Sequence, residues 1–380
     1  MKEITLPSAD FTGDLWEMLA RDGRPILVYG MGNGGDKLVS RLAAIGREVA
    51  DFFASDGFVR GQSFHGKRVL TFREAKEKHE RFVILVSFGS TRREVLDTVY
   101  GLAQDYPLYI PDMPLAGEEY FTAEFYRAHY GEIARVYGML ADEASRRVYA
   151  ALVWYKLTGD GRYLRIATET GDEHALLSYG AMTSAVDVGA YRGDTLAELL
   201  ESAPALSYVL AIEPDAKNYR RLCDYAKTVT GCKVETVMGA ALDETGTVLF
   251  ATSGNRNATV QGGKKGGTAS HEYRVTEVNG IEIDNIIRAK SVDYIKYDTE
   301  GAELLALRGS RGTILAHRPH LRVSIYHRSE DLYALPLWLA EFYRDAYRYY
   351  IRRKPCIPAW ECELIAVPVE GPDKEGENDA

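Results

Sequence analysis

The sequence is poor in cysteine, with only four such residues among 380. Cys223, Cys232, Cys356 and Cys362 form no C-x-x-C pair and no zinc-type spacing, which argues against a disulfide framework and a structural zinc site. The sequence also lacks an apolar run long enough to cross a bilayer, and its N-terminus lacks the apolar core of a signal peptide. We therefore expect a reduced, cytoplasmic protein without a membrane span.

An excess of positive charge is missing as well. The chain has 46 Lys and Arg against 55 Asp and Glu, a formal net charge of −9, whereas binding to a nucleic acid backbone needs a basic surface. Nucleic acid is therefore not an expected partner, and a homo-oligomer stays open. Hydrophobic content of 46% is ordinary for a globular chain, and the length of 380 residues favours two domains.

Apolar strands and amphipathic helices alternate along residues 1–115. The expected strands are 25–30, 48–55 and 83–90, and the expected helices are 34–46 and 91–103. Continuous apolar strands that alternate with helices indicate a parallel sheet covered by helices. Residues 1–115 are therefore predicted to form a Rossmann-like α/β domain.

Residues 116–178 show helical periodicity and little strand signal. We expect a helical connector packed between two domains, with a lid over the active site as the alternative. Strand–helix alternation resumes over residues 179–370, which predicts a second α/β domain. Within it, the glycine- and lysine-rich residues 261–271 are expected to be mobile, and residues 371–380 form an acidic tail predicted to be disordered.

A glycine turn, "AVDVGAYRGDT", begins this second domain. Asp187 precedes Gly189 and Gly193, and the next strand ends in Glu213. A carboxylate beside the turn would repel a diphosphate but attract a cationic amino-acid group, and an acid at the end of the second strand binds ribose hydroxyls. An aminoacyl cation plus a ribose, without phosphate, describes S-adenosylmethionine.

Four motifs occur in a characteristic order: "DVGAYRGDT", "AIEPDAKNYRRL", "VDYIKYDTEGAELLALRG" and "LRVSIYH". Over about residues 180–368 they resemble the FkbM family of S-adenosylmethionine-dependent methyltransferases. The resemblance implies a class I methyltransferase fold, with a mostly parallel seven-stranded sheet whose last strand is antiparallel, and O-methylation of sugars, glycans or natural products. The cofactor-binding residues that it implies are Asp187, Gly189, Tyr191, Gly193, Thr195, Glu213, Pro214 and Asp298.

An alcohol acceptor needs a base that removes its proton. Acidic or basic side chains at the expected edge of the sheet are Asp298, Glu300, Glu303 and His327. We expect His327 to be the base and Asp298 to orient the acceptor or the donor, with Glu300 and Glu303 on one face of a helix start. Capping of the following helix is the alternative for His327. A divalent ion bridging Asp298 and the acceptor stays open, but no set of metal ligands is visible, so no metal is predicted.

A second glycine turn lies near the N-terminus. Gly30, Gly32, Asn33 and Gly35 fall in a G-x-G-x-x-G fingerprint after an apolar strand, the pattern typical of dinucleotide binding. An NAD site needs an acid at the end of the second strand, where this chain has Ala54 and Ser55. Residues 49–70 resemble the small Rossmann-like domain of sugar O-acyltransferases. A structural turn and a nucleotide-sugar site are therefore favoured about equally, ahead of NAD.

Three functions remain open from the sequence. The first is an S-adenosylmethionine-dependent O-methyltransferase acting on a hydroxyl of a saccharide, nucleotide sugar or sugar-containing metabolite. The second is a sugar-modifying, NAD-dependent oxidoreductase that uses the N-terminal glycine turn. The third is a non-catalytic nucleotide-binding protein.

Overall fold

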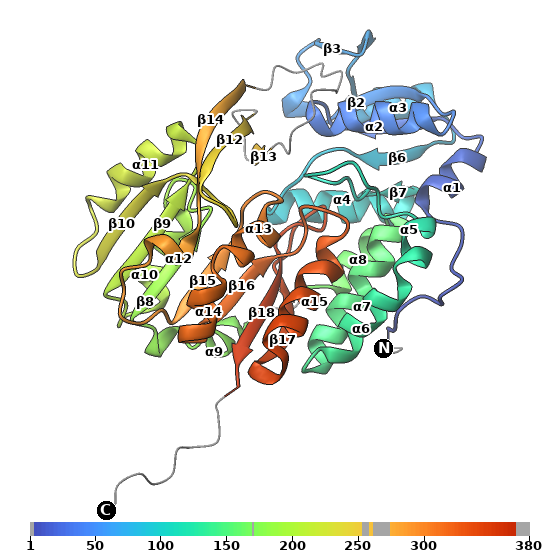
Figure 1. Cartoon of the computed structure of the whole chain (residues 1–380). Coiled ribbons are helices and arrows are strands. Elements are labelled where there is room, and N and C mark those ends of the chain that lie inside the picture. The colour runs from blue at the N-terminus through green and yellow to red at the C-terminus, as the bar shows by residue number, and fades with distance from the viewer. Residues whose placement is uncertain (1–3, 169–170, 253–257, 261–273, 370–380) are drawn as a thin grey trace, which may run out of the picture.

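The computed structural model describes residues 4–168, 171–252, 258–260 and 274–369. Figure 1 shows the first main sheet above a group of helices, and the second main sheet beside the same group. The predicted mobile residues 261–271 and the predicted disordered tail 371–380 lie outside the described residues. No helix within the described ranges has both the length and the apolar character needed to span a membrane.

The first sheet has the strand order β5-β2-β1-β6-β7, and all of its neighbouring strands run parallel. Its elements are α1 (Leu15–Arg21), β1 (Ile26–Tyr29), α2 (Asn33–Ala44), β2 (Val49–Ala54), the hairpin β3 (Ser63–Phe64) and β4 (Lys67–Arg68), β5 (Leu70–Thr71), α3 (Phe72–Lys78), β6 (Val83–Val86), α4 (Arg93–Asp105) and β7 (Leu108–Tyr109). The three predicted strands are confirmed as β1, β2 and β6. The continuous burial of β1 and β6 explains why their sequences are apolar throughout.

A group of helices follows the first sheet: α5 (Ala123–Ala128), α6 (Tyr130–Met139), α7 (Glu143–Thr158), α8 (Gly161–Ile166) and α9 (Glu173–Leu176). One hydrophobic core joins this group to both sheets, since it contains Leu27 and Val86 of the first sheet, Val148 and Leu152 of α7, and Leu364 of the second sheet. Helix α7 packs directly on β17. The helices therefore pack against both sheets. The connector and its alternative, a lid over the active site, both stay predictions. The exact domain boundaries stay a prediction.

The second sheet has the strand order β10-β9-β8-β15-β16-β18-β17. Its strands are β8 (Ser184–Val188), β9 (Tyr208–Glu213), β10 (Lys233–Met238), β15 (Tyr294–Tyr297), β16 (His320–Ser324), β17 (Tyr347–Arg353) and β18 (Cys362–Pro368). Strands β10, β9, β8, β15 and β16 pair in parallel, and β18 runs antiparallel to both β16 and β17, so that six of the seven strands point the same way. This is the seven-stranded class I methyltransferase topology that the sequence predicted, including the antiparallel last strand.

Helices α10 (Asp194–Ser202), α11 (Ala216–Ala226), α12 (Ile283–Ile286), α13 (Glu303–Arg308), α14 (Arg311–His317) and α15 (Asp331–Tyr343) accompany the second sheet. A further four-stranded sheet was not predicted. Its order is β11-β14-β12-β13, from β11 (Ala240–Ala241), β12 (Gly246–Thr252), β13 (Ala258–Val260) and β14 (Arg274–Ile281). In Figure 1, β12 and β14 project beyond the edge of the seven-stranded sheet.

Candidate active site

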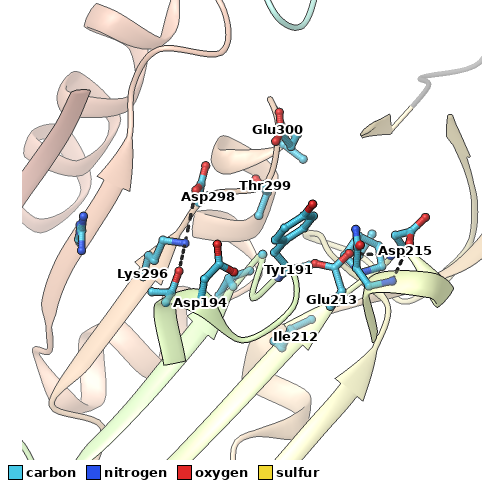
Figure 2. A pocket seen from close by; sticks show the side chains of 18 of the residues that line it. Tyr191, Asp194, Ile212, Glu213, Asp215, Lys296, Asp298, Thr299 and Glu300 are labelled. Atoms are coloured by element: carbon cyan, nitrogen blue, oxygen red, sulfur yellow. Dashed lines mark hydrogen bonds and ion pairs between the residues drawn. The ribbon is translucent and has the colours of Figure 1, made fainter. Parts of the chain in front are cut away.

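A cavity of about 260 Å³ lies at the carboxyl ends of β8, β9, β15 and β16. Parallel strands of an open sheet present their ends together at this edge, where such folds bind ligands. Figure 2 shows Glu213 and Asp215 on one side of the pocket, Lys296 and Asp298 on the other, and Tyr191 between them. Of the predicted cofactor residues, those that line the cavity are Gly189, Tyr191, Thr195, Glu213, Pro214 and Asp298.

The turn between β8 and α10 depends on glycine. Gly189 has a φ of +82°, and a Cβ at this position would collide with the carbonyl oxygen of Asp298. The backbone of the first turn therefore touches the turn that follows β15, which only a residue without a side chain allows. Gly193, with a φ of +95°, caps α10 but does not line the cavity.

Glu213, the last residue of β9, holds the turn between β8 and α10 in place. Its Oε2 accepts a hydrogen bond from the Tyr191 N–H at 2.9 Å, and its Oε1 accepts one from the Asp215 N–H at 2.9 Å. The cap of α11 is Asp215, whose side chain accepts from the N–H groups of Lys217 and Asn218. Glu213 is therefore not the helix cap, and each carboxylate oxygen keeps acceptor capacity toward the pocket. Burial raises the pKa of Glu213 to about 7.

Asp187 is one of the predicted cofactor-binding residues. Its side chain is fully buried and does not line the pocket, and neither carboxylate oxygen has a hydrogen-bond partner in the part of the chain that the structure describes. The ammonium group of Lys296 lies 3.7 Å from Asp187 and 3.4 Å from Asp298, and donates to Thr195 Oγ1 at 3.1 Å. A direct contact of Asp187 with the cofactor stays a prediction. In this structure Asp187 helps to hold Lys296, which lines the pocket.

The turn after β15 carries the polar groups at the other end of the pocket. Asp298, Thr299 and Glu300 line the cavity, and the Tyr326 hydroxyl donates to Asp298 Oδ1 at 3.3 Å. Burial opposes the charge of Asp298, but Lys296 and His327 outweigh it and lower its pKa to about 2. The expected common helix face of Glu300 and Glu303 is wrong, because α13 begins at Glu303 and Glu300 lies in the preceding turn with a φ of +56°.

Residues outside the second sheet support this turn. The N–H groups of Leu115 and Ala116 both donate to the His327 carbonyl oxygen at 2.9 Å. A Cβ on Gly301, whose φ is +98°, would collide with the Ala116 side chain. The Arg328 Nε donates to the Gly301 carbonyl oxygen at 2.8 Å. The chain between the first sheet and α5 therefore packs directly against the turn after β15.

His327 lies behind the pocket and not in its wall. The imidazole is fully buried between carboxylates: Nε2 is 3.5 Å from both Asp298 and Glu300, and Nδ1 is 3.0 Å from Glu303. Burial opposes a charge on the ring, but Glu303, Glu300 and Asp298 raise the pKa of His327 to about 10. The role of His327 as the base stays a prediction. In its alternative role His327 would cap α15, but the residue at the cap position is Glu330.

Several pocket residues were missed by sequence reasoning. They are Asp194, Glu198, Asn218, Lys296, Arg322, Tyr326, Lys354, Glu361 and Glu363. Lys296 and Arg322 lie within strands whose neighbours are apolar, and a charged residue inside a buried strand was the available signal. Three further lining residues come from β18 and the segment before it: Lys354, Glu361 and Glu363. They lie at the site because β18 pairs antiparallel to β16.

The N-terminal glycine turn opens toward a different cavity, of about 250 Å³. Of the four predicted residues, Asn33 lines it, while Gly30, Gly32 and Gly35 do not. The acid of an NAD site is missing at the end of β2, because Asp51 is buried within the strand and pairs with Lys78 and His79. Ligand binding at this turn stays a prediction.

Comparisons with known proteins place the pocket in a family. Residues 187–349 match the family described as methyltransferase FkbM domain. The structure is similar to that of a methyltransferase FkbM from Methylobacillus flagellatus KT, with 20% identity, a TM-score of 0.66, and coverage of 96% of this chain and 94% of that one. This likeness shows a common fold that includes both sheets and the helices between them.

More distant similarities are confined to about half of the chain. An rRNA methylase from Streptococcus thermophilus is 11% identical with a TM-score of 0.34, over 52% of this chain and 95% of that one. A putative caffeoyl-CoA O-methyltransferase from Staphylococcus aureus is 10% identical with a TM-score of 0.33, over 55% and 84%. No curated protein matches the sequence. The family match nevertheless identifies residues 187–349 as an S-adenosylmethionine-dependent methyltransferase domain of the FkbM family.

Proposed function

We propose that the protein transfers the methyl group of S-adenosylmethionine to a hydroxyl of a saccharide, nucleotide sugar or sugar-containing metabolite. The observation that carries this proposal is the division of one pocket into two polar ends. Glu213 lies at one end, and Asp298, Thr299 and Glu300 lie at the other. A donor bound across the pocket would thus present its methyl group to a second set of hydrogen-bonding side chains.

At the donor end, the Glu213 carboxylate accepts hydrogen bonds from the two ribose hydroxyls of the cofactor. Glu213 lines the pocket, and two backbone N–H groups fix its position. Tyr191, Thr195 and Pro214 complete the contact surface for the donor. Asp194 supplies a carboxylate for the cationic amino-acid group. This assignment keeps the predicted use of the turn and replaces Asp187 as the charge partner.

At the acceptor end, Asp298 and Glu300 divide the role that the sequence assigned to His327. Asp298 is held by Lys296 and by the Tyr326 hydroxyl, which suits it to fix the direction of an acceptor hydroxyl. Glu300 lies in the same turn, lines the pocket and receives the hydroxyl proton as the new bond forms. Alignment of the hydroxyl with the sulfonium methyl supplies the rest of the acceleration.

A saccharide fits the lining of the acceptor end. Asp298, Glu300 and Glu361 accept hydrogen bonds from hydroxyl groups, and Lys354 donates to hydroxyl oxygens. A polyol can satisfy such a mixed set of donors and acceptors without carrying a charge of its own. An anionic acceptor group placed among these carboxylates would instead be repelled.

The proposal is tested by supplying S-adenosylmethionine with a ¹³C-labelled methyl group and a panel of monosaccharides, nucleotide sugars, phenols and amines. We expect S-adenosylhomocysteine to form with a sugar acceptor, and the product's labelled carbon to have the NMR shift of a methyl ether. Glu300→Gln should lower turnover about 10²–10⁴-fold with donor affinity retained. Glu341→Gln, an exposed position paired with Arg135, is the matched control. Methylation of nitrogen or carbon, or turnover with phenols alone, would contradict the proposal.

A further inference from the structure

The cluster behind the acceptor end holds three carboxylates, and its nearby cations are the His327 imidazole and the Lys296 ammonium group, which contacts Asp298. Asp298 and Glu300 approach His327 Nε2, and Glu303 approaches Nδ1 on the other side of the ring. His327 and Glu303 are almost completely buried. Carboxylates held this close together in a buried site are costly unless a cation lies among them.

The buried groups of this cluster also have unused bonding capacity. His327 Nδ1 lies 3.0 Å from Glu303 Oε1, but neither His327 Nε2 nor Glu303 Oε2 has a hydrogen-bond partner among the described residues. In contrast, Glu303 Oε1 is fixed by the Thr299 N–H at 2.7 Å and the Gly301 N–H at 3.3 Å. Buried polar atoms are nearly always satisfied in folded proteins. The orphaned atoms therefore point to a missing ligand.

We propose that Asp298, Glu303 and His327 bind a divalent metal cation at the acceptor end of the pocket, with Glu300 beside it. Each of the three residues offers one ligand atom, and these atoms lie within 4.8 Å of one another. Ligands on opposite sides of a bound cation are about 4.0–4.4 Å apart. The contacts of His327 with Glu303 at 3.0 Å and with Asp298 at 3.5 Å are shorter than that span.

The ligand set indicates which cations fit. One imidazole and two carboxylates suit Mn²⁺, Fe²⁺ or Zn²⁺ better than the oxygen-seeking Mg²⁺ and Ca²⁺. Three protein ligands leave positions open, as in catalytic sites and unlike closed structural ones. The open positions would face the pocket, because Asp298 lines it whereas Glu303 and His327 lie behind it.

This cation would give the site a way to activate a poor nucleophile, a step that rests on the proposed function. Contact with the cation lowers the pKa of the acceptor hydroxyl. The hydroxyl oxygen then forms a bond to the methyl carbon while the carbon–sulfur bond breaks, and S-adenosylhomocysteine leaves. The hydroxyl proton passes to Glu300, so that charge and atoms balance without any further reactant.

The experiment uses the full chain freed of metal with a chelator and titrated with Mn²⁺ in the absence of any methyl donor. The free-ion electron paramagnetic resonance signal measures binding, and we expect one Mn²⁺ per chain. Glu303→Gln and His327→Gln should each weaken binding at least tenfold. Asp298→Asn should also weaken Mn²⁺ binding at least tenfold. The Asp298 side chain is partly exposed, so this variant serves as the test if Glu303→Gln or His327→Gln fails to fold.

The control is His79→Gln, which alters a histidine that also pairs with a carboxylate, Asp51, in the first sheet. This variant should bind Mn²⁺ like the unaltered chain. Absence of binding by the unaltered chain, or equal weakening by His79→Gln, would overturn the proposal. Because no donor or acceptor is present, a failure of the proposed function appears separately, as a chain that binds Mn²⁺ but methylates no sugar.

Discussion

Replacing Glu213 by glutamine tests the donor end of the pocket most directly. The variant keeps the size of the side chain and one oxygen acceptor, but loses the charge and one acceptor position. A hydrogen bond to a charged group contributes about 1.5–3 kcal/mol, so loss of one such bond to a ribose hydroxyl predicts a dissociation constant about 10–150-fold higher. The backbone N–H groups of Tyr191 and Asp215 each donate to one oxygen of this side chain. Because the glutamine amide nitrogen cannot accept one of these bonds, we expect the increase in the dissociation constant to be about 150-fold.

Isothermal titration calorimetry with S-adenosylmethionine measures this change, and circular dichroism checks that the variant is folded. The matched control is Glu235→Gln on the neighbouring strand β10, where the carboxylate bonds Tyr208 and Lys233 and does not line the pocket. We expect the control to bind the donor normally. A folded Glu213→Gln variant with unchanged affinity would refute the assignment of the ribose site.

Three further predictions follow from the same geometry. Because burial raises the pKa of Glu213 above its ordinary value of 4.5 to about 7, donor affinity measured by calorimetry should fall as the pH drops below about 7, and Glu213→Gln should abolish this dependence. Gly189→Ala should lower the melting temperature well below that of Gly46→Ala, since both have positive φ but only Gly189 lacks space. If the N-terminal turn binds an anionic ligand, Gly32→Asp should abolish that binding without changing donor affinity, which a screen of nucleotide sugars and NAD would show.

Local sequence patterns were sufficient for most of the fold. The strands β1, β6 and β8 are buried along their whole length, so each appears as an apolar run between turn residues. Strand β14 was missed because Glu277 and Asn279 are exposed and Gly280 lies at its end, so that no apolar run marks it. Its pairing with β12 comes from residues about 30 positions away, which single-sequence periodicity does not detect.

The same distinction explains the site. Gly189 and Glu213 were found because their roles depend on the strand end on which each lies, and strand ends can be read from sequence. The role of His327 depends on burial by Asp298, Glu300 and Glu303 from another turn. Sequence reasoning placed this histidine at the carboxyl-end edge of the second sheet, but it did not predict that His327 lies behind the residues that line the pocket. A charge environment made by several segments is a property of the packed structure.

The acceptor end of the pocket also depends on chain outside the methyltransferase domain. Leu115 and Ala116 bind the His327 carbonyl oxygen, and Ala116 packs where Gly301 has no side chain. The Ser329 hydroxyl donates to the Glu119 carbonyl oxygen at 2.7 Å. None of the donor-end contacts described above involves this segment. The chain before the domain therefore helps to set the position of the turn after β15, and a change at Ala116 would reach Asp298 and Glu300 before it reached Glu213.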